Sequence, residues 1–218
     1  VSWRLIGGMI MVHGDDKGLV LPPRVAPIQV IIIPIYYSDE DKENIQKVSK
    51  QIEDELREVN IRVQVDNREQ LTPGFKFNDW EMKGIPLRIE IGPKDLENNK
   101  VTFARRHNRQ KDDQDIAGLV QRVVSELDKI HNDMFADASK ILEERTVEVD
   151  NYNEFKTQLE KGRLIKAPIC ENPDCEEKIK EETGADVRVI TKDAADTSSK
   201  CIKCSDQSVI RPLFARGY

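Results

Sequence analysis

The 218-residue sequence has no run of about eighteen or more apolar residues, few aromatic residues (6%) and only three histidines. A helix that crosses a membrane needs about 20 apolar residues, so we expect no membrane-spanning segment. Residues 1–5 lack a basic start followed by a long apolar run, so we expect no signal peptide. The formal net charge of −6 excludes a globally basic nucleic-acid binder. Any RNA site must therefore be a local basic face on an acidic protein.

Charged residues make up 34% of the chain and hydrophobic residues 38%. The apolar residues come in periodic runs, which is typical of folded domains, and the length suits one large domain or two small ones. Because no secretion signal is expected, the four cysteines favour metal binding or free thiols over disulfides.

The first segment ends at a candidate domain boundary. Residues 4–13 are apolar, but the segment is too short for periodicity to separate helix from strand. Residues 14–18 have the composition of a turn. Pro22, Pro23 and Pro27 then predict a stiff, extended stretch between domains.

Residues 30–65 predict a strand, a helix and a second strand. Val30–Ile35 is a continuous apolar run, typical of a strand buried on both faces. Ser38 and the acids after it predict a helix start, and apolar residues at helical spacing follow over 45–59. Residues 61–65 alternate as a strand, so the three elements predict a right-handed parallel crossover.

The middle of the chain predicts more strands and a long helix. Apolar residues alternate along 87–91, which places Arg88 and Glu90 together on the opposite face of that strand. A further strand is predicted over 101–106, and helical spacing extends over 116–142.

The pattern restarts near residue 147. Residues 147–149 predict a strand, Asn151 can cap a helix that Gly162 stops, and strands follow at 164–169 and 187–190. The sequence therefore predicts an α/β domain over 28–133, with a mixed sheet and flanking helices, and a smaller α+β domain over 134–218.

Four cysteines form two close pairs, a C-x4-C and a C-x2-C motif separated by twenty-five residues. Each pair can place two thiolates on one ion, and two pairs complete the tetrahedron that zinc prefers. The hypothesis is a structural Zn²⁺ site; two disulfides or four unused thiols are the alternatives. The proposed ligands are Cys170, Cys175, Cys201 and Cys204.

Two further clusters have both a functional and an ordinary interpretation. His13 and Asp15 could form an acid–base pair, or lie in a solvated turn. A basic run could neutralise phosphates, or form a solvated hairpin. The run comprises Arg105, Arg106, His107, Arg109 and Lys111.

Longer motifs resemble one family. Residues 6–23, IGGMIMVHGDDKGLVLPP, resemble the end of the catalytic domain of prolyl-tRNA synthetase, of the archaeal and eukaryotic type. Residues 73–93, PGFKFNDWEMKGIPLRIEIGP, are similar to the anticodon-binding domain of that family. The four-cysteine segment and the terminal FARGY, residues 214–218, complete the resemblance in order.

The resemblance implies a class II aminoacyl-tRNA synthetase that is a proline–tRNA ligase. In such enzymes the proline carboxylate attacks the α-phosphate of ATP, and the prolyl-adenylate then acylates tRNA(Pro). The implied partners are tRNA(Pro), L-proline and ATP with Mg²⁺, in a cytoplasmic homodimer without DNA or membrane. The implied domains are the end of a catalytic domain (1–27), an anticodon-binding domain (28–133) and a zinc-binding domain (134–218).

The resemblance also implies roles for individual residues. Arg4 matches the family's ATP-binding motif 3 arginine, and His13, Asp15 and Tyr218 would lie near the active site. The residues implied to contact the anticodon are Glu81 and Arg88, with weaker matches at Lys94, Asp95, Arg105 and Arg106.

The sequence departs from the family pattern at one point, and its motifs leave a second function open. The family usually has several residues between its motif 3 tryptophan and arginine, whereas Trp3 is joined directly to Arg4. Class II motifs 1 and 2 would lie before Val1, so this chain alone lacks most of a catalytic domain. The alternative function is a non-catalytic RNA-binding or adaptor module built from the same two domains.

Overall fold

The structure is a computed structural model that describes residues 2–192 and 194–217. The chain divides into two compact units, Val1–Ala138 and Ser139–Tyr218, which we call the N-terminal and C-terminal units. This division lies near the boundary that the sequence predicts between residues 133 and 134. The three domain ranges given above stay a prediction. Among the described residues, no helix is both long and apolar enough to cross a membrane.

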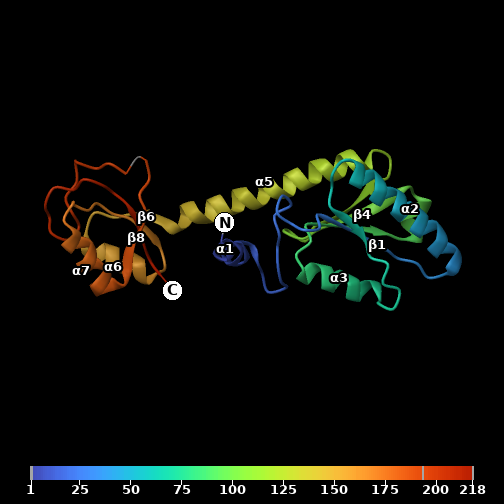
Figure 1. Ribbon diagram of the computed structural model, residues 1–218, viewed down its shortest axis with the longest axis horizontal. Helices are drawn as coiled ribbons and strands as arrows, with labels where there is room; N and C mark the ends of the chain where they lie inside the picture. Colours follow the sequence, from blue (N-terminus) through green and yellow to red (C-terminus); the bar gives the residue numbers. More distant parts are fainter. Residues whose placement is uncertain (1, 193, 218) are drawn as a thin grey trace. The chain divides into compact units, whose positions relative to one another are not determined.

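The described residues of the N-terminal unit form a mixed five-stranded sheet in the order β2-β1-β3-β4-β5 (Figure 1). Strand β1 pairs in parallel with β2 and β3, and β4 pairs antiparallel with β3 and β5. The strands are β1 (Val30–Pro34), β2 (Val63–Val65), β3 (Leu87–Ile91), β4 (Lys100–Arg105) and β5 (Lys111–Asp115). The helices are α1 (Trp3–His13), α2 (Asp39–Glu58), α3 (Pro73–Met82), α4 (Pro93–Glu97) and α5 (Leu119–Arg145).

Local sequence explains the β1–α2–β2 crossover. The Ser38 hydroxyl accepts a hydrogen bond from the backbone N–H of Asp41 at 3.1 Å, which caps α2. Ile45, Ile52 and Leu56 recur at helical spacing and are buried against the sheet. The predicted parallel crossover is confirmed.

The sheet is covered on both faces. Helices α2 and α5 pack on one face, against the side chains of Val30, Ile32 and Leu87. Trp80 of α3 packs on the other face, against Ile31. Figure 1 shows α2 and α3 on opposite sides of the strands. Because side chains alternate along a strand, the face that carries α3 is also the face of Arg88 and Glu90.

The apolar segment whose type the sequence left open is a helix, α1. Each of its residues stays at least partly exposed, and Trp3, Leu5 and Met11 are among the most exposed apolar side chains. The helix therefore gains little from burial within the N-terminal unit.

The described residues of the C-terminal unit form a four-stranded sheet in the order β6-β7-β9-β8, with helices α6 and α7. Phe155 and Phe214 are fully buried and meet edge to face, with 5.3 Å between ring centroids. The strands are β6 (Thr146–Glu148), β7 (Leu164–Lys166), β8 (Ala185–Val189) and β9 (Leu213–Arg216), and the helices are α6 (Tyr152–Glu160) and α7 (Pro173–Thr183). The predicted fold class, a mixed α/β sheet followed by a smaller α+β domain with four clustered cysteines, is confirmed.

Candidate functional site

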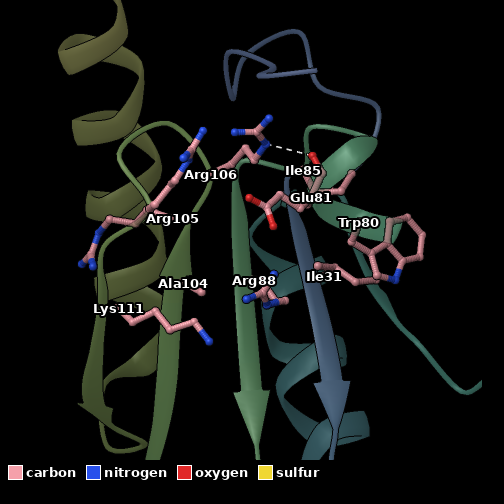
Figure 2. Close-up of a pocket in the computed structure, with 10 residues that line it drawn as sticks. Ile31, Trp80, Glu81, Ile85, Arg88, Ala104, Arg105, Arg106 and Lys111 are labelled. Carbon is pink, nitrogen blue, oxygen red and sulfur yellow. Dashed lines mark hydrogen bonds between the residues drawn. The ribbon is translucent and has the colours of Figure 1, made fainter. Parts of the chain in front are cut away.

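A pocket of about 120 Å³ opens on the α3 side of the N-terminal sheet (Figure 2). Helix α3 supplies one wall, and β3, β4 and the start of β5 supply the other. The lining is rich in cations, although the whole chain is acidic. It comprises Ile31, Trp80, Glu81, Ile85, Arg88, Ala104, Arg105, Arg106, Arg109 and Lys111.

Arg88, near the start of β3, is held in place on that wall of the pocket. Its Nε donates to Glu90 Oε1 at 2.9 Å, and its guanidinium carbon lies 4.4 Å from the centroid of the Phe77 ring. Lys111 Nζ donates to the same Glu90 oxygen at 2.7 Å. The planar fork is therefore stacked and oriented before any ligand arrives, which is a favourable arrangement for reading a base.

Glu81 adds a carboxylate to the same pocket from the last turn of α3. Its side chain is about a fifth exposed, and Lys17 Nζ lies 3.8 Å from Glu81 Oε1. In Figure 2 the side chain of Glu81 lies between those of Arg106 and Arg88. The structure thus brings a hydrogen-bond acceptor, Glu81, and a donor, Arg88, into one pocket, as the sequence suggested.

Arg105 also lines the pocket, but its guanidinium is turned toward α5. Its Nη2 donates to Glu126 Oε2 of α5 at 2.8 Å, and its Nη1 contacts Asp112 of β5. These hydrogen bonds raise the already high pKa of Arg105 against the opposing effect of burial. Figure 2 shows this side chain directed away from Arg88. Its charge is therefore already compensated inside the protein.

Arg106 is the most deeply buried cation of the pocket, with a side chain only 3% exposed. Its two terminal nitrogens donate to the Asp15 carboxylate at 2.8 and 2.6 Å, and Arg109 donates to Asp15 at 2.9 Å. The hydrogen bond from Arg106 holds the pKa of Asp15 far below its usual range against the effect of burial, with Arg109 adding to it. The basic run is thus largely paired with carboxylates.

The residues implied to lie near an active site occupy separate places. The Asp15 carboxylate accepts hydrogen bonds from Arg106 and Arg109, so Asp15 and His13 do not form an acid–base pair in the structure. His13 ends α1, where burial and the nearby charge of His131 lower its pKa. Arg4 is exposed on α1, and Tyr218 lies outside the described residues.

Lys94 and Asp95 lie in α4, beyond the C-terminal end of β3, whereas Arg88 lies at the start of that strand. The Asp95 carboxylate accepts from the Gly92 N–H at 2.8 Å and so caps α4. Lys94 is exposed. The structure does not bring this pair to the pocket.

In the C-terminal unit the four cysteines converge from three segments. Cys170 follows β7, Cys175 lies in the first turn of α7, and the other two lie in a turn before β9. All four sulphur atoms lie within 4.8 Å of one another, and all four cysteines are free. Cys170 Sγ is 3.6 Å from Cys175 Sγ and 3.7 Å from Cys204 Sγ. A tetrahedral ion at about 2.3 Å from each sulphur separates the sulphurs by about 3.8 Å, so the cluster fits zinc.

Phe77, which the structure places beneath Arg88, was not among the predicted site residues. Glu81 was expected at a helix end before the turn at Gly84, but the bounds of that helix, α3, were not predicted, although Thr72 caps it and Pro73 occupies its first position. Within α3, the i, i+3, i+4 spacing of Phe77, Trp80 and Glu81 places the three side chains on one face, and the cap and proline are the sequence signals for that helix.

Comparison with known families divides the chain in the same way as its two sheets. The family model described as "Anticodon binding domain" matches residues 29–126, which hold the pocket. The model described as "Prolyl-tRNA synthetase, C-terminal" matches residues 152–218, which hold the cysteine cluster.

Curated relatives match the whole chain. It is 46% identical over 218 residues to "Proline--tRNA ligase" of Cenarchaeum symbiosum and 45% identical over 218 residues to "Proline--tRNA ligase 2" of Clostridioides difficile. It is 41% identical over 225 residues to "Proline--tRNA ligase" of Deinococcus radiodurans. In each case all of this chain aligns with 45% of the relative, so the chain spans less than half the length of these proteins. The chain therefore belongs to the prolyl-tRNA synthetase family and corresponds to its anticodon-binding domain followed by its C-terminal domain.

Proposed function

We propose that this chain is the tRNA-recognising part of a proline–tRNA ligase, and that the pocket between α3 and β3 reads the anticodon of tRNA(Pro). The observation that carries the proposal is that an acceptor, Glu81, and a donor, Arg88, line the same cation-rich pocket. Arg88 is stacked on Phe77 there. The whole protein would form prolyl-adenylate from L-proline and ATP with Mg²⁺ and transfer proline to tRNA, as a cytoplasmic homodimer. The names of the relatives support this activity.

The chemistry of the pocket suits guanine, which tRNA(Pro) carries in its anticodon because proline codons begin with two cytosines. A guanine exposes N–H donors that a carboxylate such as Glu81 can accept, and O6 and N7 acceptors that an arginine fork can contact. Proteins read single-stranded RNA by splaying its bases out and stacking them on aromatic rings or guanidinium planes. The Arg88–Phe77 stack offers such a plane.

Replacing Arg88 by alanine is expected to weaken binding of the cognate tRNA(Pro) transcript by about 1–3 kcal/mol, the value of one bidentate base contact. Binding of a transcript with a changed anticodon should weaken much less, so discrimination between the two falls. Filter binding of both transcripts to the full-length protein measures this. Lys47→Ala removes an exposed charge on α2, on the opposite face of the sheet, and is the matched control.

Equal weakening of both transcripts by Arg88→Ala would instead assign Arg88 to a phosphate, which carries no sequence information. The catalytic part of the proposal has a separate test. Proline-dependent ATP–pyrophosphate exchange by the full-length protein should stay near normal in Arg88→Ala, because that step does not involve the anticodon. Intact tRNA binding without any exchange in the unmodified protein would favour the adaptor alternative.

For the C-terminal unit, we propose that the four cysteines hold one structural Zn²⁺. Four thiolates complete a tetrahedron and leave no position for a substrate. Cys175 lies in the first turn of α7, and its burial raises the pKa of its thiol, so a bound metal ion would supply the positive charge that holds it as a thiolate. The metal would join three segments of a small domain.

A further inference from the structure

The segment that follows α1 is hydrogen-bonded to the end of α3 and to the loop after it. Glu81 lies in the last turn of α3. The backbone N–H of Leu19 donates to the Met82 carbonyl at 3.0 Å, and the N–H of Leu21 donates to the Gly84 carbonyl at 3.1 Å. Residues 15–21 therefore run beside residues 81–84 as a pair of hydrogen-bonded segments.

Two glycines permit this close approach. Gly18 has φ +129°, and a Cβ atom there would lie 2.4 Å from the Met82 carbonyl oxygen. Gly84 has φ +74°, and a Cβ atom there would lie 2.6 Å from the backbone of Leu19. Any other residue at either position would force the two segments apart, so the junction depends on the sequence at both sides.

Arg106 closes the junction. Its Nε donates to the Glu81 backbone carbonyl at 2.8 Å, the contact drawn as a dashed line in Figure 2. Its two terminal nitrogens hold both oxygens of Asp15, in the turn that opens the 15–21 segment. One planar group thus fixes the turn after α1 and the backbone of Glu81 at the same time.

The burial of Arg106 excludes a simple role as a surface cation. A guanidinium that is 97% buried is tolerated only when its charge is paired and its N–H groups are hydrogen-bonded. Asp15 supplies the charge, and the Glu81 carbonyl, which also accepts from the Gly84 N–H at 3.0 Å, supplies a further acceptor at the end of α3. The side chain that the sequence suggested as an RNA contact therefore points into the protein.

We infer that Arg106, braced by Asp15, is a positioning residue for anticodon discrimination: it fixes the backbone of Glu81 and does not itself contact RNA. The inference rests on the proposed function of the pocket. It also gives Asp15 a role in recognition of tRNA, although the sequence placed Asp15 near an active site.

The test measures how well the full-length protein discriminates cognate tRNA(Pro) transcript from one with a changed anticodon. Arg106→Lys keeps the charge but cannot hold Asp15 and the Glu81 carbonyl together, and Asp15→Asn keeps the shape but loses the charge. Each should lower the ratio of the two affinities roughly tenfold, which is the scale of one lost base contact. Arg122→Ala is the control, because Arg122 bridges the carboxylate and the carbonyl of Asp115 away from the pocket.

A double-mutant cycle separates positioning from general structural damage. If Arg106 acts through Glu81, then Arg106→Lys should cause no further loss of discrimination in a Glu81→Ala background. Additive losses would overturn the inference, and so would equal weakening of both transcripts by Arg106→Lys, which indicates a phosphate contact. Thermal unfolding checks that the variants are folded; if Arg106→Lys is not, the milder Asp15→Asn carries the same cycle. If the unmodified protein does not discriminate, the proposed function fails as well, and that failure is visible before any variant is made.

Discussion

Removing zinc from the four-cysteine cluster, or replacing Cys175 by serine, is expected to unfold the C-terminal unit. The sulphur atoms join three chain segments, and Cys175 and Cys201 are themselves part of the small hydrophobic core. Structural zinc contributes about 10–16 kcal/mol to the folding of zinc-finger peptides, more than the whole stability of most small domains. Loss of the metal should therefore abolish the folded state of residues 139–218, while the five-stranded sheet survives.

Metal analysis and two-dimensional NMR of the same sample would follow both effects. The unmodified protein should contain one zinc per chain, and chelation should collapse the NMR signals of the C-terminal unit only. Lys178→Ala changes an exposed residue on the same helix as Cys175 and should leave metal content and spectrum unchanged. A C-terminal unit that stays folded with less than about a tenth of an equivalent of zinc would contradict the prediction.

Asp66→Ala is expected to cause a large loss of stability in the N-terminal unit, about 3–5 kcal/mol. The Asp66 side chain is 1% exposed, accepts from Trp80 Nε1 at 2.7 Å and pairs with Arg68 at 2.7 Å. Lys76 Nζ, also buried, lies 4.0 Å from the same carboxylate. Removing the carboxylate takes the hydrogen-bond acceptor from the Trp80 indole N–H and the neighbouring negative charge from the buried Lys76 ammonium. Urea unfolding measures the loss, and Asp54→Ala, which breaks an exposed pair with Lys50 on α2, should cost less than about 1 kcal/mol.

Asp66 also predicts a dependence of stability on pH. Burial acts to raise its pKa, but hydrogen bonds from Arg68 and Trp80 outweigh this and lower the pKa to about 2. Because the folded-state pKa lies below the unfolded value of about 3.9, the stabilisation is complete above that value and is lost as the pH falls toward 2. The difference in unfolding free energy between the unmodified protein and Asp66→Asn should therefore shrink between about pH 4 and pH 2. A difference that stays constant over this range would contradict the assignment.

Elements with strong local signals were predictable from the sequence. The apolar run at β1 and the caps at Ser38 and Asn151 correspond to elements that the structure contains. Strand β5 was missed because its sequence, KDDQD, has no strand propensity; it is a strand because it pairs with β4. Helix α7 was missed because few of its residues are apolar, although Asn172 caps it and Pro173 occupies its first position.

The site was predictable where it depends on local alternation and not where it depends on distant partners. Arg88 and Glu90 share a face because they are two residues apart in a strand, which the sequence shows directly. Arg105 and Arg106 looked equally available for RNA. Their partners, Glu126 and Asp15, lie 21 and 91 residues away along the chain, and no pattern in one sequence reveals such pairs.

The two edge strands of the five-stranded sheet, β2 and β5, disfavour pairing with the sheet of a second copy of the chain. Strand β2 forms one edge and is only three residues long, so it offers few free backbone groups. Strand β5 forms the other edge, and Asp112, Asp113 and Asp115 lie along it. A second copy that added β5 to β5 would bring like charges together, which is unfavourable. The short strand at one edge and the acidic strand at the other thereby protect the sheet against edge-to-edge aggregation.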